Sequence, residues 1–492
     1  MPITKYLITI ILIANTELSI GNDKISKQLE KDIELNETVE VYVLLKNHAH
    51  IKLKSFDNRI EKLSNSIKQL KSNATISQNN IKQLLSSLTT NYKFYWINNS
   101  FWARIQSHKV KELIASDFVI KAYSNNTTHL KTINTNYLEK TSLQTIEWNI
   151  NRVSAPQVWQ MGIKGQGVLI AGQDTGYQWN HASIKNKYAG WDGINVNHNY
   201  HWHDAIFNPN IDCLDTINMP ISCDDHGHGT HTMGIMVGDD GQGNQIGVAP
   251  EAKWIGCRNM NQGDGTPATY TECFQFFMEP TDLNNNNPDV TKAPHIINNS
   301  WGCPISEGCV QPDVLETVVN NVVDAGILVV VAAGNTGSSC NSINTPIAIY
   351  AKALTIGSTT SSDEISSFSS QGAVVVDGSN RIKPDIVAPG SNIRSAQLNG
   401  NYINFNGTSM AAPHVVGVAA LMISANPAMA GKPKILKHVL LRTSLPLSTF
   451  QTCNGVLGFD RPNNTFGWGR INALDAVNQI KDIIFLDNYE YF

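Results

Sequence analysis

Short hydrophobic stretches in the first part of the chain alternate between strand and helix periodicity. Their order is strand, helix, strand, strand, helix, strand, which is typical of a small α+β sandwich of the split-βαβ type. The strands are predicted at residues 39–45, 92–97, 101–105 and 118–123, and the helices at 51–70 and 110–115.

From Val168 onward the pattern changes to continuous runs of Val, Ile and Ala that alternate with helical spacing. Fully apolar strands alternating with helices indicate a mostly parallel sheet covered by helices on both faces. The predicted fold class is therefore α/β, preceded by the small α+β unit. Strands are predicted at 168–173, 253–260, 295–300, 327–332 and 353–358, and helices at 268–278, 314–325, 410–424, 434–442 and 472–480.

The N-terminal residues have the pattern of a secretory signal. One lysine, Lys5, precedes an apolar run over 6–14, which is too short to span a bilayer, and no later run approaches that length. Residues 124–143 are polar and rich in Asn and Thr, as in an exposed linker. We divide the chain into a signal peptide (1–20), the α+β unit (24–130), a linker (131–147), the α/β domain (148–480) and a tail (481–492). The expected destination is extracellular, with a lysosomal or vacuolar lumen as the alternative.

Charge is distributed unevenly along the 492 residues, whose net charge is −4. The overall balance argues against a nucleic-acid partner. Residues 23–131 contain 17 Lys and Arg against 10 Asp and Glu, a net of +7, so residues 132–492 carry −11. The two parts are either complementary halves of one assembly or unrelated solvated surfaces, and counting does not decide between them.

All eight cysteines lie between Cys213 and Cys453, in a chain expected to be exported, so disulfides are predicted. No pair has the Cys-x-x-Cys spacing of a zinc site, and the local pairs predicted are Cys213–Cys223 and Cys303–Cys309. Acceptor sequences for N-glycans occur at Asn36, Asn73, Asn98, Asn125 and Asn126.

Four polar side chains stand at positions suited to catalysis. Asp174 closes the strand motif V-L-I-A-G-Q-D-T-G, His228 lies in D-D-H-G-H-G-T-H, and Asn335 closes V-V-V-A-A-G-N-T-G. Functional residues of parallel sheets follow the C-terminal ends of strands. Ser409, in N-G-T-S-M-A-A-P-H, begins an apolar helix whose free N–H groups favour negative charge, and Pro413 is expected among its early positions. Taken singly, each residue also fits a turn or a helix cap.

The order Asp, His, Ser matches one class of serine hydrolase. Together the motifs D-T-G, H-G-T-H, A-A-G-N and G-T-S-M-A-A-P-H resemble the subtilisin family of serine proteases, over roughly Trp148 to Ile480. The segments 146–159 and 244–250 look closest to its bacillopeptidase F branch. The resemblance implies a subtilisin-like sheet and hydrolysis of protein or peptide substrates by a secreted endopeptidase.

The resemblance also implies roles for individual residues. Asp174, His228 and Ser409 would form the catalytic triad, and Asn335 would contribute to the oxyanion hole. The implied substrate-binding residues are Ser300, Trp301, Gly302, Ala333 and Gly334. Trp301 stands where the family usually has a smaller apolar residue. We interpret His231 and His414 as core histidines and His226 as a surface one.

The N-terminal unit resembles the inhibitory propeptide of such proteases, with N-S-F-W-A-R-I-Q-S-H-K-V-K-E-L (99–113) as its closest stretch. This implies a zymogen with a cis inhibitor and cleavage within 124–143. We expect a monomer without a membrane anchor or a cofactor. The family's long calcium-binding loop is not apparent before Gly247, Asp239 and Asp240 are expected to be solvated, and a calcium site elsewhere is left open.

The insert over 201–225 has no counterpart that we can assign. The competing functions are a catalytically silent relative that acts as a binding protein, and an exopeptidase or narrow processing peptidase. A lipase or esterase is rejected because it would need a G-x-S-x-G motif and another chain order.

Overall fold

The computed structural model describes residues 24–46, 51, 58–129, 133–134, 145–206, 213, 221–302 and 311–483. The expected signal peptide, most of the linker, the end of the tail and the predicted Cys303–Cys309 pair lie outside these residues.

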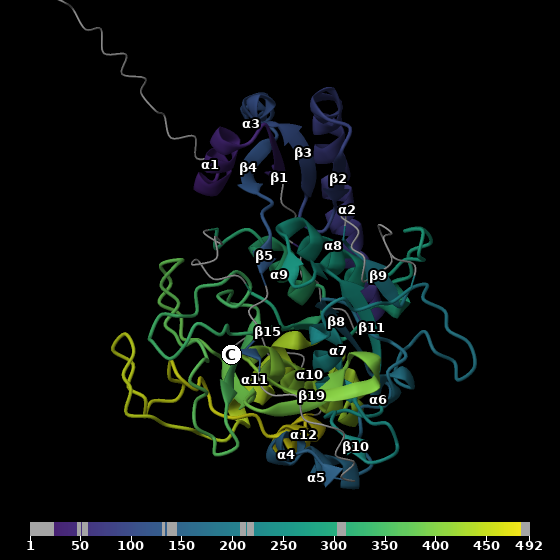
Figure 1. The fold of residues 1–492 in the computed structure, drawn as a ribbon, viewed down its shortest axis with the longest axis vertical. Helices are drawn as coiled ribbons and strands as arrows, with labels where there is room; N and C mark the ends of the chain where they lie inside the picture. Colours follow the sequence, from purple (N-terminus) through teal and green to yellow (C-terminus); the bar gives the residue numbers. More distant parts are fainter. Residues whose placement is uncertain are drawn as a thin grey trace, which may run out of the picture.

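A seven-stranded sheet forms the centre of the larger body, with helices on both sides (Figure 1). Its strand order is β17-β16-β15-β14-β8-β11-β9, and every neighbouring pair is parallel. All five predicted strands are present and the α/β class is confirmed, whereas the short edge strands β9 and β17 are not predicted by the pattern. The strands are β8 (Leu169–Asp174), β9 (Trp202–Asp204), β11 (Lys253–Arg258), β14 (Ile296–Asn299), β15 (Leu328–Ala332), β16 (Leu354–Thr359) and β17 (Ile386–Pro389).

The two faces of this sheet belong to different hydrophobic clusters because side chains alternate along each strand. Ile297 and Val329 pack with helices α8 and α9, whereas Ile296 and Val330 pack with α7, α10, α11 and α12. The helices are α7 (His228–Val237), α8 (Pro267–Met278), α9 (Glu316–Asp324), α10 (Thr408–Ala425), α11 (Pro433–Arg442) and α12 (Ala473–Lys481). Among the described residues, α10 alone has the length and hydropathy of a membrane span, but 89% of it is buried inside the protein. Its apolar composition is accounted for by its place in this core.

The smaller unit is a four-stranded antiparallel sheet of order β2-β3-β1-β4, as the split-βαβ pattern requires. Its strands are β1 (Thr38–Leu45), β2 (Tyr92–Tyr95), β3 (Ser100–Gln106) and β4 (Val119–Ser124), and its helices are α1 (Lys27–Leu35), α2 (Arg59–Leu88) and α3 (Val110–Ala115). The helix predicted over 51–70 instead begins at Arg59 and continues to Leu88. Its second half is rich in Ser, Asn and Gln, yet Ile81 and Leu85 extend the buried face.

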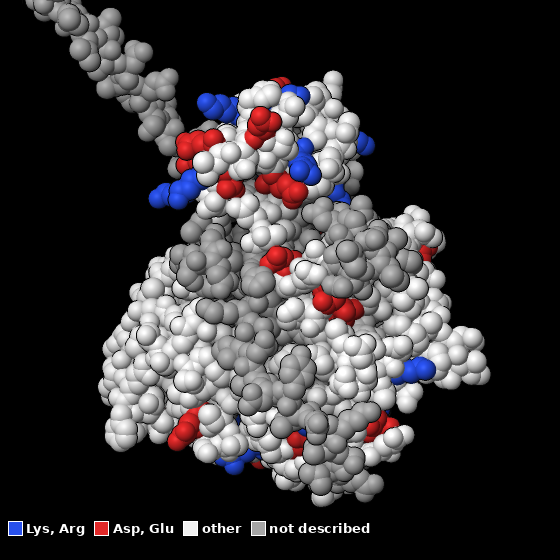
Figure 2. Space-filling model, viewed as in Figure 1, with Lys and Arg blue, Asp and Glu red and all other residues white. Residues whose placement is uncertain are grey.

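The smaller unit packs against the α8 and α9 side of the larger body (Figure 1). One hydrophobic cluster runs through both, joining side chains such as Tyr95 and Ile97 to Phe274. Charged pairs surround it, and each joins a lysine of the smaller unit to an acid of the larger body. They are Lys71–Glu279, Lys93–Glu272 (2.5 Å) and Lys121–Asp313 (3.0 Å). In Figure 2 side chains of both charges gather on this smaller, upper lobe, whereas the visible face of the larger lobe is mostly uncharged.

Three short sheets and the helices α4 (Trp148–Arg152), α5 (Ala155–Gln160) and α6 (Ala182–Lys185) lie outside these elements. Strand β18 (Ile393–Gln397) pairs with β19 (Asn401–Asn406), which also pairs with β6 (Ile133–Asn134). Strand β13 (Asp264–Gly265) pairs with β12 (Met260–Asn261) and with β5 (Thr128–His129). Strand β7 (Thr145–Ile146) pairs with β10 (Asn244–Gln245). The segment that follows the smaller unit therefore adds strands to the larger body at three places.

The predicted Cys213–Cys223 disulfide is present, together with Cys257–Cys273 and Cys340–Cys453, which spacing alone does not indicate. Two of the glycan acceptor sequences are not accessible in this fold. Asn98 is buried and its amide donates to the Tyr42 hydroxyl at 2.7 Å, while the buried Asn125 donates to Glu40 at 3.2 Å.

Candidate active site

Asp174 and His228 form a buried hydrogen-bonded pair at the C-terminal end of the sheet. Asp174 is the last residue of β8 and His228 the first of α7, and the two are 0% and 1% exposed. His228 Nδ1 lies 2.7 Å from Asp174 Oδ1, which also accepts the Thr175 N–H at 2.8 Å. Because a carboxylate only accepts, Nδ1 carries the imidazole proton and Nε2 of the neutral ring keeps its lone pair.

Ser409 is the second residue of α10 and exchanges two hydrogen bonds with Ser300. Its hydroxyl donates to the Ser300 carbonyl at 3.0 Å, and the Ser300 hydroxyl donates to the Ser409 carbonyl at 2.8 Å. The second bond has a local cause. Pro413 is interior to the helix, contrary to the expectation that it stands among the unpaired first N–H positions. Since proline has no N–H to offer the carbonyl four residues back, the Ser300 hydroxyl satisfies that carbonyl instead.

The Asn335 side chain is held by Thr408, the residue before Ser409. Its Oδ1 accepts both the Thr408 N–H at 2.9 Å and the Thr408 hydroxyl at 3.0 Å. This turns Nδ2 toward Gly407, where an added Cβ would lie 3.4 Å from Asn335 Nδ2 and 3.6 Å from the Ser409 nitrogen. The Asn335 amide nitrogen, the Ser409 nitrogen and Met410 Sδ (3.6 Å) therefore all lie around this point beside Gly407.

Ser300, Trp301 and Gly302 follow the end of β14, and Ser300 contacts Ser409 directly. Ser300 is fully buried by its exchange with Ser409. The Trp301 ring stacks on Tyr270, with the ring centroids 3.6 Å apart and the planes 2° from parallel. The Trp301 side chain at this position is therefore packed face to face with a second aromatic ring.

Ala333 and Gly334 connect β15 to Asn335, and several of their backbone groups are bonded within the protein. The Ala333 N–H donates to Ile356 at 2.9 Å, and the Gly334 carbonyl accepts from Ser370 at 3.0 Å. The structure thus places both residues beside Asn335, with the Ala333 N–H and the Gly334 carbonyl bonded within the protein.

The neighbouring histidines separate into core and site residues. His231 is fully buried, donates Nε2–H to the Ile403 carbonyl at 3.1 Å, and has a pKa lowered to about 3 by burial. His414 is buried between the Met410 carbonyl and the Asn149 amide, each at 2.8 Å, and burial lowers its pKa to about 4. Both confirm the core interpretation. His226 is half-buried, so it is neither a core residue nor a fully exposed one, and burial lowers its pKa.

Sequence reasoning missed a chain of buried amides beneath the site. Asn259 donates to Gln173 at 2.9 Å, Gln173 donates to Asn299 at 2.7 Å, and Asn299 donates to the Val330 carbonyl at 3.0 Å. The chain runs from Asn259, just after β11, across β8 and β14 to β15, and it ties together the strand ends at Asp174 and before Ser300. Its only sequence signal is the presence of amides in otherwise apolar strands.

The loop before Gly247 does not fit a calcium ion. Asp240 accepts the N–H groups of Gln242 (2.8 Å) and Asn244 (3.1 Å) and the Asn244 amide (2.6 Å), and its carboxylate is only partly exposed. The Arg394 guanidinium donates to Asn244 Oδ1 at 2.8 Å and to Glu147 at 2.9 Å. Calcium needs six to eight oxygen ligands, whereas these oxygens already face donors and a fixed cation. The described part of the chain holds no group of three or more His, Cys, Asp or Glu arranged for a metal.

The larger body is similar in sequence to known proteases. The profile of the subtilase family matches residues 165–469. Bacillopeptidase F of Bacillus subtilis (strain 168) is 36% identical over 352 residues, covering 68% of this chain and 22% of that protein. M-protease of Shouchella clausii (strain KSM-K16) is 32% identical over 334 residues, 68% of this chain and 70% of the relative. Subtilisin BL of Lederbergia lenta is 30% identical over 331 residues, 67% and 98% respectively. The chain therefore spans about a fifth of the length of bacillopeptidase F.

The buried histidines predict a loss of stability in mild acid. His231 and His414 have pKa values of about 3 and about 4 in the folded protein, against 6.5 when exposed. Between pH 6.5 and 4 the unfolded chain binds more protons than the folded one, so the free energy of unfolding should fall as the pH falls. Urea unfolding of the Ser409→Ala protein, which excludes self-digestion, measures this slope. The slope of the free energy of unfolding against pH should become shallower in Ser409→Ala/His414→Asn. An unchanged slope would contradict a lowered pKa for His414.

Proposed function

Because the chain belongs to the subtilase family, whose members are serine endopeptidases, we propose that it is a secreted endopeptidase made as a zymogen. It would hydrolyse protein or peptide substrates through an acyl-enzyme. The observation that carries the proposal is the buried Asp174–His228 pair at the same sheet end as Ser409, whose nitrogen and the Asn335 amide converge beside Gly407.

The proposed chemistry follows from the proton positions. The Ser409 hydroxyl turns from the Ser300 carbonyl toward His228 and attacks the scissile carbonyl while its proton passes to Nε2. Asp174 holds Nδ1–H and stabilises the imidazolium. The amine leaves with the proton from Nε2, and water repeats the sequence on the acyl group, which frees Ser409.

The oxyanion of each tetrahedral intermediate would lie in the space beside Gly407. The Ser409 N–H and the Asn335 amide surround this space, and the Thr408 bonds fix the amide before substrate arrives. Such preorganised donors cost no reorganisation during the reaction. In subtilisin itself, loss of the equivalent amide donor lowers turnover by about 10²–10³, and we adopt that known magnitude for Asn335→Ala.

The smaller unit is proposed to be an inhibitor in cis. Its hydrophobic cluster continues into the larger body, its lysines pair with Glu272, Glu279 and Asp313, and the segment that follows it adds a strand to β13. Strand addition of this kind is how extended peptides bind a sheet edge. Substrate would use the same edge once the unit leaves.

Export is proposed on chemical grounds. The three disulfides of the described residues require an oxidising compartment to form and persist. One relative, 31% identical, is named the major intracellular serine protease of Bacillus subtilis (strain 168), so family membership by itself does not determine the compartment. The mature enzyme is proposed to act as a monomer.

A fluorophosphonate probe tests the nucleophile. We expect the probe to label Ser409 in the matured wild-type protein and to leave Ser409→Ala unlabelled, with the modified peptide identified by mass spectrometry. Asn335→Ala should be labelled more slowly because the probe also develops negative charge on oxygen. Absence of labelling after the smaller unit has been removed would favour the catalytically silent relative.

The position of the maturation cut is bracketed by two strand pairings. Thr128 and His129 pair with β13, and Ile133 and Asn134 pair with Asn406 and Phe405 of β19. Strand β19 leads directly into Ser409. The described residues before and after 130–132 therefore pair with two different sheets, one of which contains the strand that precedes Ser409.

We expect self-cleavage between His129 and Ile133. Sequencing the new N-terminus by mass spectrometry after incubation of the purified precursor locates the cut, and Ser409→Ala should remain intact under the same conditions. A cut C-terminal to Asn134, or before Thr128, would contradict the bracketing.

Calcium is proposed to be unnecessary because Arg394 supplies a fixed cation to the loop at Asn244. Incubation with a chelator should therefore leave the melting temperature unchanged. Arg394→Met, which keeps a long side chain over Tyr402 but removes the charge, should lower the melting temperature by a few degrees, about 1–3 kcal/mol for lost charged hydrogen bonds. A large drop on chelation of the wild-type protein would refute this proposal.

A further inference from the structure

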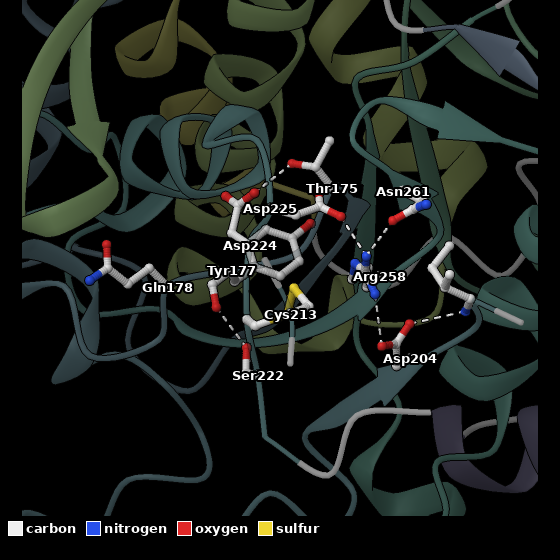
Figure 3. Close-up of a disulfide and its surroundings, with 12 residues drawn as sticks. Thr175, Tyr177, Gln178, Asp204, Cys213, Ser222, Asp224, Asp225, Arg258 and Asn261 are labelled. Atoms are coloured by element: carbon white, nitrogen blue, oxygen red, sulfur yellow. Dashed lines mark hydrogen bonds and ion pairs between the residues drawn. A yellow bond between two sulfur atoms is a disulfide. The ribbon is translucent and has the colours of Figure 1, made fainter. Parts of the chain in front are cut away.

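The insert over 201–225, which the family resemblance leaves unexplained, ends in three residues that are each anchored. Cys223 forms the disulfide with Cys213. The Asp225 carboxylate pairs with the buried Arg258 guanidinium, which also binds Asp204 at 3.1 Å (Figure 3). The residue between these two anchors, Asp224, is thereby fixed on both sides.

The Asp224 carboxylate joins the two segments that carry Asp174 and His228. On one side it accepts the Thr175 hydroxyl at 2.8 Å (Figure 3), directly after Asp174. On the other side it accepts the N–H groups of His226 (3.1 Å), Gly227 (2.8 Å) and Thr230 (2.9 Å) and the Thr230 hydroxyl (2.6 Å). All five bonds are short enough to be good hydrogen bonds.

These bonds replace a cap that helix α7 lacks. Its N-cap residue, Gly227, has no side chain to bind the free N–H groups. Asp224 binds three N–H groups around that end and carries a negative charge, which the helix N-terminus favours. The start of α7, and His228 with it, is therefore held by a residue outside the helix.

The same segments are in close backbone contact. The Tyr177 N–H donates to the Cys223 carbonyl at 2.8 Å, and the Gly229 N–H donates to the Thr175 hydroxyl at 3.1 Å. A Cβ on Gly176 would lie 1.9 Å from the Cys223 carbonyl oxygen, and one on Gly229 would lie 2.0 Å from the Gly176 carbonyl oxygen. The three segments of chain stack so closely that a shift of Asp224 moves Thr175 and α7 together.

We propose that Asp224 is a positioning residue of the active site, which sets the distance and orientation of His228 relative to Asp174, and that the disulfide and the Asp225–Arg258 pair of the insert hold it in place. Asp224 acts through Thr175 and the first turn of α7. The proposal rests on the proposed function for its catalytic consequence, but the geometry that it asserts can be measured without turnover.

The first measurement is spectroscopic and uses the full chain with Ser409→Ala. The proton on His228 Nδ1, hydrogen-bonded to a carboxylate, gives a low-field resonance that reports this bond. Asp224→Ala should shift that resonance upfield or lose it to solvent exchange. Asp224→Asn keeps an oxygen for Thr175, His226 and Gly227 but loses the Thr230 bonds. Its resonance should therefore lie between that of the Ser409→Ala protein and that of Asp224→Ala in the same background.

The second measurement is the rate of self-cleavage of the precursor with Ser409 intact. Asp224→Ala should be slower by about 10- to 100-fold, since small misplacements of catalytic groups have effects of that size, and Asp224→Asn should recover part of the rate. The matched control is Asp363→Ala, which removes a carboxylate that binds Arg152 and Arg470 elsewhere in the body. It should lower the melting temperature and leave both readouts unchanged.

An unchanged resonance and rate in Asp224→Ala, with stability lowered as in the control, would overturn the positioning role. If Asp224→Ala does not fold, Asp224→Asn decides in the same way. A wild-type precursor that never self-cleaves would reject the proposed function, while the resonance would still decide the role of Asp224.

Discussion

The rest of the site depends on the burial of one carboxylate. Asp174 is fully buried at the end of a central strand, where an ionised group without partners would be very costly. Its partners, the His228 imidazole and the Thr175 N–H, must therefore be positioned within hydrogen-bonding distance with little freedom to move. Gly229 permits this approach, because an added Cβ there would lie 3.0 Å from the Asp174 Cβ. The parallel sheet answers the requirement by bringing strand ends and helix starts to the same edge.

Much of the fold can be predicted from the sequence because its main elements are locally encoded. The five inner strands are continuous apolar runs, and α10 is apolar on every side. Strands β9 and β17 escape prediction, since three or four residues show no periodicity and only their neighbours make them strands. The second half of α2 escapes for another reason. Its polar composition conceals a buried face that becomes evident only when Ile81 and Leu85 meet the small sheet.

The residues of the site likewise divide into those that the sequence predicts and those that it does not. Asp174, His228, Asn335 and Ser409 stand at strand ends and a helix start, which motif and pattern both indicate. The supports of these residues are not local: Ser300 and Ser409 are 109 residues apart, and Thr175 and Asp224 are 49 apart. No hydrophobic periodicity in the sequence predicts such long-range pairs. Pro413 shows the difficulty. The sequence predicts it among the first helical positions, and its place inside the helix is explained only by the distant Ser300 hydroxyl, which satisfies the carbonyl that proline leaves without an N–H partner.

On the proposed function, the contact between the two units is what holds the smaller unit in place after its covalent link is cut. The Lys71–Glu279 and Lys121–Asp313 pairs are partly solvated, and such pairs contribute little each. Glu272 is buried, so the cost of removing its charge from water offsets much of its attraction to Lys93. The hydrophobic cluster that runs through both units contributes more, because it removes apolar side chains such as Tyr95 and Phe274 from water altogether. The charges therefore orient the smaller unit, and the apolar contact sets its affinity. Strand β5 is held differently. Only its two residues pair with β13, so this pairing depends on the tether between β5 and the smaller unit, which is itself bound. A cut beyond His129 keeps that tether, so on the proposed function the cleaved unit goes on blocking the edge until the apolar contact itself dissociates.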